Sequence, residues 1–208
     1  MRFRVHAKSM FVGLGFALAL VASACSSSAS DSLEASSLVP DASEAAEATG
    51  VAADPGIVED LDAAYAEFSA LLGSFGGATF SEEQAELLAR VDCGRIASSS
   101  SAENFADGWE QFNARRIADG LDADVLRTLT VVAVITYCPQ WNLPVTASFT
   151  PELLLSTSSA PEFGEQVRLA VEDGALPERG REIVVDAFLG TDTYTDEQKA
   201  QFTEAVAG

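Results

Sequence analysis

Apolar side chains recur at three- and four-residue intervals through almost all of the chain after residue 55, and this period constrains the fold most. The first such stretch carries Ile57, Leu61, Tyr65, Phe68 and Leu72. This spacing places them on one face of a helix, whereas a half-buried strand would alternate apolar and polar residues. Because the period continues toward the C-terminus, we predict an all-α fold.

Capping signals mark where individual helices begin. Ser81 and Gln84 have the spacing of a capping box, and the apolar period then continues to about Ile96. Residues 193–198 echo residues 79–84 in sequence. A degenerate internal duplication is one interpretation of this likeness, and independent use of the same capping chemistry is the other.

Two more helices are predicted before a proline. The third carries Phe105, Trp109 and Phe112 on one face, which we interpret as core packing rather than as a carbohydrate-stacking surface. The fourth is nearly buried and ends at Pro139. Further on, Thr150 stands before a proline and is predicted to cap another helix.

The N-terminal residues have the parts of an export signal. Residues 1–24 begin with basic residues, continue with an apolar run over 10–21 that is too short to span a bilayer, and end in small residues before Cys25. This ending resembles the lipobox of bacterial lipoproteins, which implies a diacylglyceryl anchor (with palmitate) on Cys25 and a location on the extracytoplasmic face of the cell membrane. The same small residues also fit ordinary secretory cleavage, which would release a secreted protein.

Residues 25–54 are predicted to be the lipidated cysteine followed by a disordered acidic tether. They consist mostly of Ala, Ser, Val and acidic residues, without an aromatic or basic side chain. Such a segment cannot bury enough apolar surface to offset the entropy of ordering. As a flexible coil, roughly 29 residues would reach about 30 Å.

Charge and histidine content exclude several classes of function. The formal net charge is -20, and the few basic residues are dispersed, so nucleic acid is not expected as a ligand. The only histidine, His6, lies in the signal. A mature chain without histidine has neither a Ser-His-Asp triad nor a histidine-ligated metal site.

Cys93 and Cys138 are expected to form a disulfide. Both lie near predicted helix ends in a chain directed to export, where disulfides persist. A redox role is disfavoured, because no CxxC spacing and no histidine accompany them. The full fold prediction is a small disulfide-linked helical bundle over residues 55–142, with additional C-terminal helices over residues 143–208 packed on it.

Part of this predicted bundle resembles a known family of protein domains. The carrying residues are Val91-Asp92-Cys93 and the apolar run 131–136 leading into Tyr137-Cys138-Pro139. Over residues 60–142 they resemble a domain of unknown function found in secreted mycobacterial and other actinobacterial proteins. The resemblance implies export and a small disulfide-linked helical fold. It implies no activity and no catalytic residues.

The remaining acidic residues do not indicate a specific site. Asp122 and Asp124 open a predicted helix, where negative charge is favourable. Two sets could gather calcium but lack the EF-hand pattern, so no metal ion and no cofactor are predicted. These sets are Asp119, Asp122 and Asp124, and Asp192, Asp196 and Glu197.

The predicted function is that of a membrane-anchored cell-envelope lipoprotein of unknown activity. We expect a non-catalytic module that binds an envelope protein or assists an envelope complex, and not an enzyme. The alternatives are a cell-wall glycan hydrolase that uses two carboxylates and a carrier of an apolar ligand. After the signal, one lysine stands against eight arginines, which indicates a GC-rich, actinobacterial source.

Overall fold

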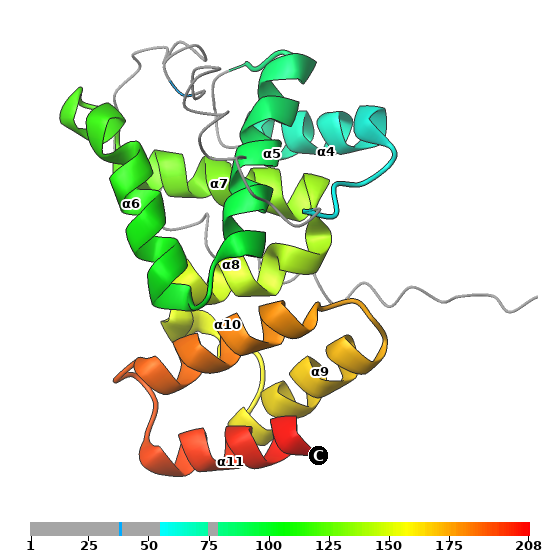
Figure 1. Cartoon of the computed structure of the whole chain (residues 1–208), viewed down its shortest axis with the longest axis vertical. Helices are drawn as coiled ribbons and strands as arrows, with labels where there is room; N and C mark the ends of the chain where they lie inside the picture. The colour runs from blue at the N-terminus through cyan, green and yellow to red at the C-terminus, as the bar shows by residue number, and fades with distance from the viewer. Residues whose placement is uncertain (1–37, 39–54, 75–78) are drawn as a thin grey trace, which may run out of the picture.

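The computed structural model describes residue 38 and residues 55–74 and 79–208. All regular elements within these residues are helical, so the predicted all-α class is confirmed. In chain order (Figure 1) they are α4 (Leu61–Ser74), α5 (Glu82–Ser98), α6 (Ala102–Ala118), α7 (Ala123–Tyr137), the 3-10 helix η1 (Pro139–Trp141), α8 (Asn142–Phe149), the 3-10 helix η2 (Pro151–Leu153), α9 (Ala160–Glu172), α10 (Glu178–Gly190) and α11 (Asp196–Ala207).

Helix α7 is the central element of the first group of helices. It packs against α4, α5 and α8 (Figure 1), and its side chains Val132, Ala133 and Val134 are almost completely buried. The hydroxyl of its buried residue Thr136 donates to the carbonyl of Val132 at 2.8 Å. The nearly continuous apolar sequence of α7 predicts this arrangement, in which amphipathic helices surround an apolar one.

The last three helices form a second group around stacked aromatic rings. The ring of Phe188 stacks on Phe202 with centroids 4.1 Å apart and on Tyr194 at 4.4 Å. Phe163 of α9 stacks on Phe202 at 5.5 Å. Helix α10 also packs on α8, so it joins this group to the first one (Figure 1).

The region between the two groups differs from the prediction. Thr150 caps no α-helix, because its hydroxyl donates back to the carbonyl of Thr146 and a 3-10 turn follows. The next α-helix begins at Ala160, where Ser159 and Glu162 form the capping box. The sequence also gave no prediction of α8, whose Pro144 lies in the first turn, a position that needs no amide hydrogen.

Both predicted capping boxes are present. The amide of Gln84 donates to the hydroxyl of Ser81 at 3.2 Å, and the amide of Gln198 donates to Thr195 at the same distance. In each case the glutamine side chain accepts from the backbone amide of the capping residue. The likeness of residues 79–84 and 193–198 therefore includes the same capping motif, which both a duplication and independent use of this chemistry would produce.

Helices α9 and α11 approach closely at Gly164. A Cβ there would lie 2.7 Å from the carbonyl oxygen of Phe202 and 2.8 Å from the Cβ of Ala205. We expect Gly164→Ala to force the two helices apart and to lower the free energy of unfolding by about 1–3 kcal/mol. Urea unfolding followed by circular dichroism measures this change.

A matched control is Gly73→Ala in α4, where no atom of the described residues lies within 4 Å of the new Cβ. This substitution should leave stability unchanged or raise it by up to about 1 kcal/mol, because alanine restricts the unfolded chain. If the two variants unfold at the same urea concentration, the close contact between α9 and α11 is contradicted.

Candidate functional site

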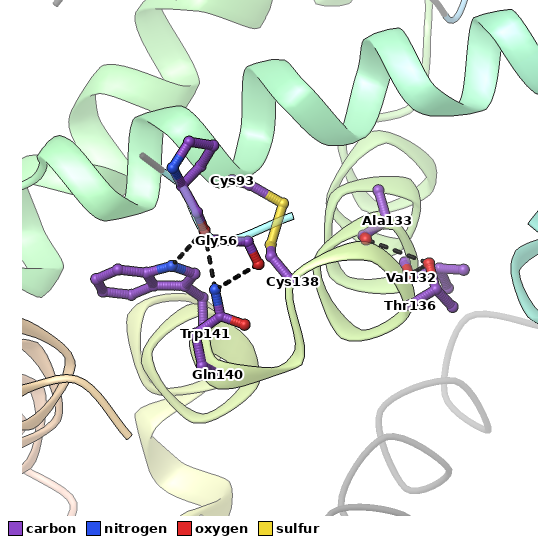
Figure 2. Close-up of a disulfide and its surroundings, with 9 residues drawn as sticks. Gly56, Cys93, Val132, Ala133, Thr136, Cys138, Gln140 and Trp141 are labelled. Carbon is purple, nitrogen blue, oxygen red and sulfur yellow. Dashed lines mark hydrogen bonds between the residues drawn. A yellow bond between two sulfur atoms is a disulfide. The ribbon is translucent and has the colours of Figure 1, made fainter. Parts of the chain in front are cut away.

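The predicted disulfide is present in the core. Cys93 of α5 bonds to Cys138, the residue after α7, with Cα atoms 6.3 Å apart (Figure 2). Both cysteines are fully buried. The bond thus fixes the C-terminal end of α7 on α5. Of the other predicted site residues, Cys25 and the rest of the signal lie outside the described residues.

The chain enters the folded domain directly beside this disulfide. The carbonyl of Pro55 accepts hydrogen bonds from Nε2 of Gln140 at 2.9 Å and from the indole nitrogen of Trp141 at 3.0 Å. Gln140 also donates to the carbonyl of Gly56 at 2.8 Å (Figure 2), and the amide of Val58 donates to the carbonyl of Tyr137 at 2.8 Å. We call these six residues the junction clamp.

Gly56 is required by the geometry of the junction clamp. Its φ angle is +67°, a left-handed conformation that side-chain-bearing residues rarely adopt. A Cβ at this position would also lie 2.2 Å from Nε2 of Gln140. The turn therefore allows the backbone to approach the Gln140 amide closely enough for both hydrogen bonds.

A second candidate site is a buried polar network between α5, α6 and α7. At its centre, the indole nitrogen of Trp109 donates to the hydroxyl of Thr130 at 2.9 Å, and the Thr130 side chain is hydrogen bonded to Asp92. Asp92 is only 2% exposed. The residues of this Asp92 network are Asp92 and Arg95 of α5, Trp109, Asn113 and Arg116 of α6, and Thr130 of α7.

Both arginines of the Asp92 network contact residues of α6. The guanidinium of Arg95 lies 4.4 Å from the ring centroid of Phe112, and that of Arg116 lies 5.0 Å from it. Arg95 also donates to the carbonyl of Gly108. Arg116 donates to the side chain of Asn113 at 2.8 Å. Cation–π contacts and these hydrogen bonds orient both cations near a buried carboxyl group.

Burial dominates the electrostatics of this network. It raises the pKa of Asp92 from 3.8 to about 6, although the Thr130 hydrogen bond and the charges of Arg95 and Arg116 oppose the shift. Burial likewise lowers the pKa of Arg95. The Oδ2 atom of Asp92 has no hydrogen-bond partner among the described residues. The charged form of Asp92 is therefore only partly compensated, and it titrates closer to neutral pH than an ordinary aspartate.

The surface carboxylates mostly have structural partners. Asp122 caps α7 by accepting from the amides of Asp124 and Val125. Asp124 pairs with Arg127 at 3.0 Å. In the part of the chain that the structure describes, no three Asp, Glu, His or Cys side chains gather as a metal site. The two sets considered for calcium are thus not brought together there.

Sequence reasoning did not assign a role to Asp92 or to the junction clamp. A signal for Asp92 was available, because it lies four residues after Leu88 and four before Ile96, within the apolar stripe of α5. Both neighbours in that stripe are buried. An acidic residue inside such a stripe is buried with it. The clamp had no comparable signal, because it joins residues far apart in sequence.

Comparisons with known proteins returned no relationship. No family model, no curated protein and no solved structure matches the chain. The resemblance to the actinobacterial family stays a prediction. Among the residues that the structure describes, no helix is both long enough and apolar enough to cross a bilayer.

Proposed function

We propose that this protein is a cell-envelope lipoprotein, held on the extracytoplasmic face of the cell membrane by lipid on Cys25. Its helical domain works there as a non-catalytic module that binds a protein partner or assists an envelope complex. Two or three acyl chains on one cysteine would hold the domain on the membrane, whereas a single chain would anchor it only marginally.

The observation that carries this proposal is the buried disulfide. Its sulfur atoms lie in the core between α5 and the end of α7, so the folded domain keeps them from solvent. Structural disulfides of this kind form and persist outside the reducing cytosol. They fit a chain whose N-terminus resembles an export signal ending at Cys25.

A binding role is favoured over catalysis by the position of the perturbed carboxyl group. Asp92 has the raised pKa expected of a catalytic acid, but its side chain is buried between α5, α6 and α7, away from the surface where a substrate would bind. On the surface, Glu86 pairs with Arg90 at 2.6 Å and Glu182 pairs with Arg179 at 3.0 Å. The acidic surface suits a partner whose contact face carries lysine and arginine.

Lipid attachment is tested by metabolic labelling with a fatty-acid analogue. We expect the wild-type chain to incorporate label and to fractionate with membranes. Cys25→Ser should lose the label completely and leave the membrane fraction, whereas Ser27→Ala, two residues away, should behave as wild type. An unlabelled wild type, or label that persists in Cys25→Ser, would show that the proposed anchor is wrong.

The binding role is tested separately by affinity capture from envelope fractions with the mature chain as bait. The same partner should be recovered in repeated experiments and should elute as the salt concentration rises, because charge attraction is screened. Failure to recover a specific partner would count against a binding module and would leave the lipid anchor untouched.

A further inference from the structure

The segment predicted as a tether contains a residue of the folded core. Leu38 is the only residue of that segment that the structure describes, and it is helical and 2% exposed. It belongs to the same hydrophobic cluster as the core residues of the helical domain. A leucine in a free coil would be largely exposed, whereas Leu38 is packed within this cluster.

The junction clamp fixes the chain to the domain a second time. Pro55 and Gly56 together accept three hydrogen bonds from Gln140 and Trp141, and Val58 donates one to Tyr137. The clamp lies beside the disulfide, which ties α5 to the residue after α7. The chain is therefore attached to the domain at Leu38 and again from Pro55 onward.

Net charge does not favour attachment of the leader to the domain. The stretch from residue 26 to residue 54 carries only acidic charges, and the whole chain has a formal net charge of -20. Like charges on leader and domain repel each other. Burial of the apolar Leu38 side chain favours attachment, and salt does not weaken this contribution.

We infer that Leu38 docks the N-terminal leader on the helical domain, so that only residues 26–37 separate Cys25 from the folded body. Its consequence for the membrane rests on the proposed lipid anchor. A coil of about 12 residues reaches about 19 Å, compared with about 30 Å for the whole predicted tether. The domain would therefore be held closer to the bilayer than its leader length suggests.

Thiol accessibility tests the docking without any need for lipid. In the mature chain carrying Cys25→Ser, Leu38→Cys adds the only free thiol, and its reaction with a maleimide is followed in native buffer and in denaturant without reductant. We expect native labelling at least 100-fold slower than labelling of the denatured chain. The matched control is Leu169→Cys, because Leu169 is 43% exposed and should react within about tenfold of the denatured rate.

If Leu38→Cys reacts as fast as Leu169→Cys in a folded chain, the docking is wrong. A second measurement covers the case in which the variant does not fold: hydrogen exchange of the unsubstituted leader, read on peptides that span residue 38. We expect exchange at least tenfold slower than in the denatured chain, and exchange at the denatured rate would overturn the inference. Protection lost at high salt would also contradict docking by apolar burial.

Neither measurement depends on Cys25. A chain that takes up no lipid but protects residue 38 would disprove the anchor and support the docking. A lipidated chain with an unprotected residue 38 would do the reverse. The two proposals therefore fail separately.

Discussion

Removing the Cys93–Cys138 disulfide should lower the free energy of unfolding of the mature domain by about 4 kcal/mol. The bond closes a sequence separation of 45 residues, and the loop-closure entropy of that length gives this figure. We expect the loss in the double variant Cys93→Ala, Cys138→Ala. Alanine is preferred to serine here, because both positions are fully buried and an unpaired hydroxyl would add its own cost.

Urea unfolding followed by circular dichroism, with and without reductant, measures this effect and supplies its control. Reductant should destabilise the wild-type chain by a similar amount, because it breaks the S–S bond and leaves both cysteine side chains in place. The double variant should not respond to reductant. A variant within about 1 kcal/mol of the oxidised wild type would show that the cross-link contributes little.

The loss of stability should be largest at the junction clamp. Cys138 lies between Tyr137, which accepts from Val58, and Gln140, which holds Pro55 and Gly56. Without the disulfide, the end of α7 is no longer tied to α5, so hydrogen exchange at Val58 should rise more than exchange in α11. Equal changes at the two places would indicate uniform destabilisation instead.

The helices could be predicted because their signals are local. The capping boxes at Ser81 and Thr195 and the apolar period of α5 and α7 depend on residues within a few positions of each other. The pairing of Cys93 with Cys138 followed from there being two cysteines after Cys25. At α8 the local rule was ambiguous, since Pro144 fits a helix start as well as a break.

The parts that sequence reasoning missed depend on distant contacts. Leu38 is one apolar residue in an acidic, alanine- and serine-rich stretch, and average composition hides a single buried side chain. The state of Asp92 depends on Thr130 and Arg116, which reach it from two other helices. Spacing along α5 can suggest that Asp92 is buried, but it cannot identify which cations and hydroxyls face it.

The second large effect is a dependence of stability on pH that comes from Asp92. Its pKa is 3.8 in an ordinary environment and about 6 in the folded domain, chiefly because of burial. The folded chain therefore binds this proton more tightly than the unfolded chain. The resulting stability is fully present below pH 3.8 and is lost as pH rises through 6. A shift of this size corresponds to about 3 kcal/mol.

Asp92→Asn isolates this contribution, because asparagine has nearly the same shape and does not titrate. We expect the stability of wild type relative to the variant to fall by about 2 kcal/mol between pH 4 and pH 7. The comparison uses this change with pH and not the offset between the two proteins, since the variant also removes the charge that faces Arg95 and Arg116. Urea unfolding at several pH values supplies both curves.

Thr130→Val shows whether the effect arises in the Asp92 network. The Thr130 hydrogen bond stabilises the charged carboxylate and holds the pKa of Asp92 lower than burial alone would place it. Its removal should move the pH at which stability is lost upward, although the indole of Trp109 also loses its acceptor and lowers overall stability. A wild-type curve parallel to that of Asp92→Asn from pH 4 to pH 7 would mean that Asp92 stays charged when buried. The guanidinium groups of Arg95 and Arg116 would then compensate the carboxylate far better than its burial suggests.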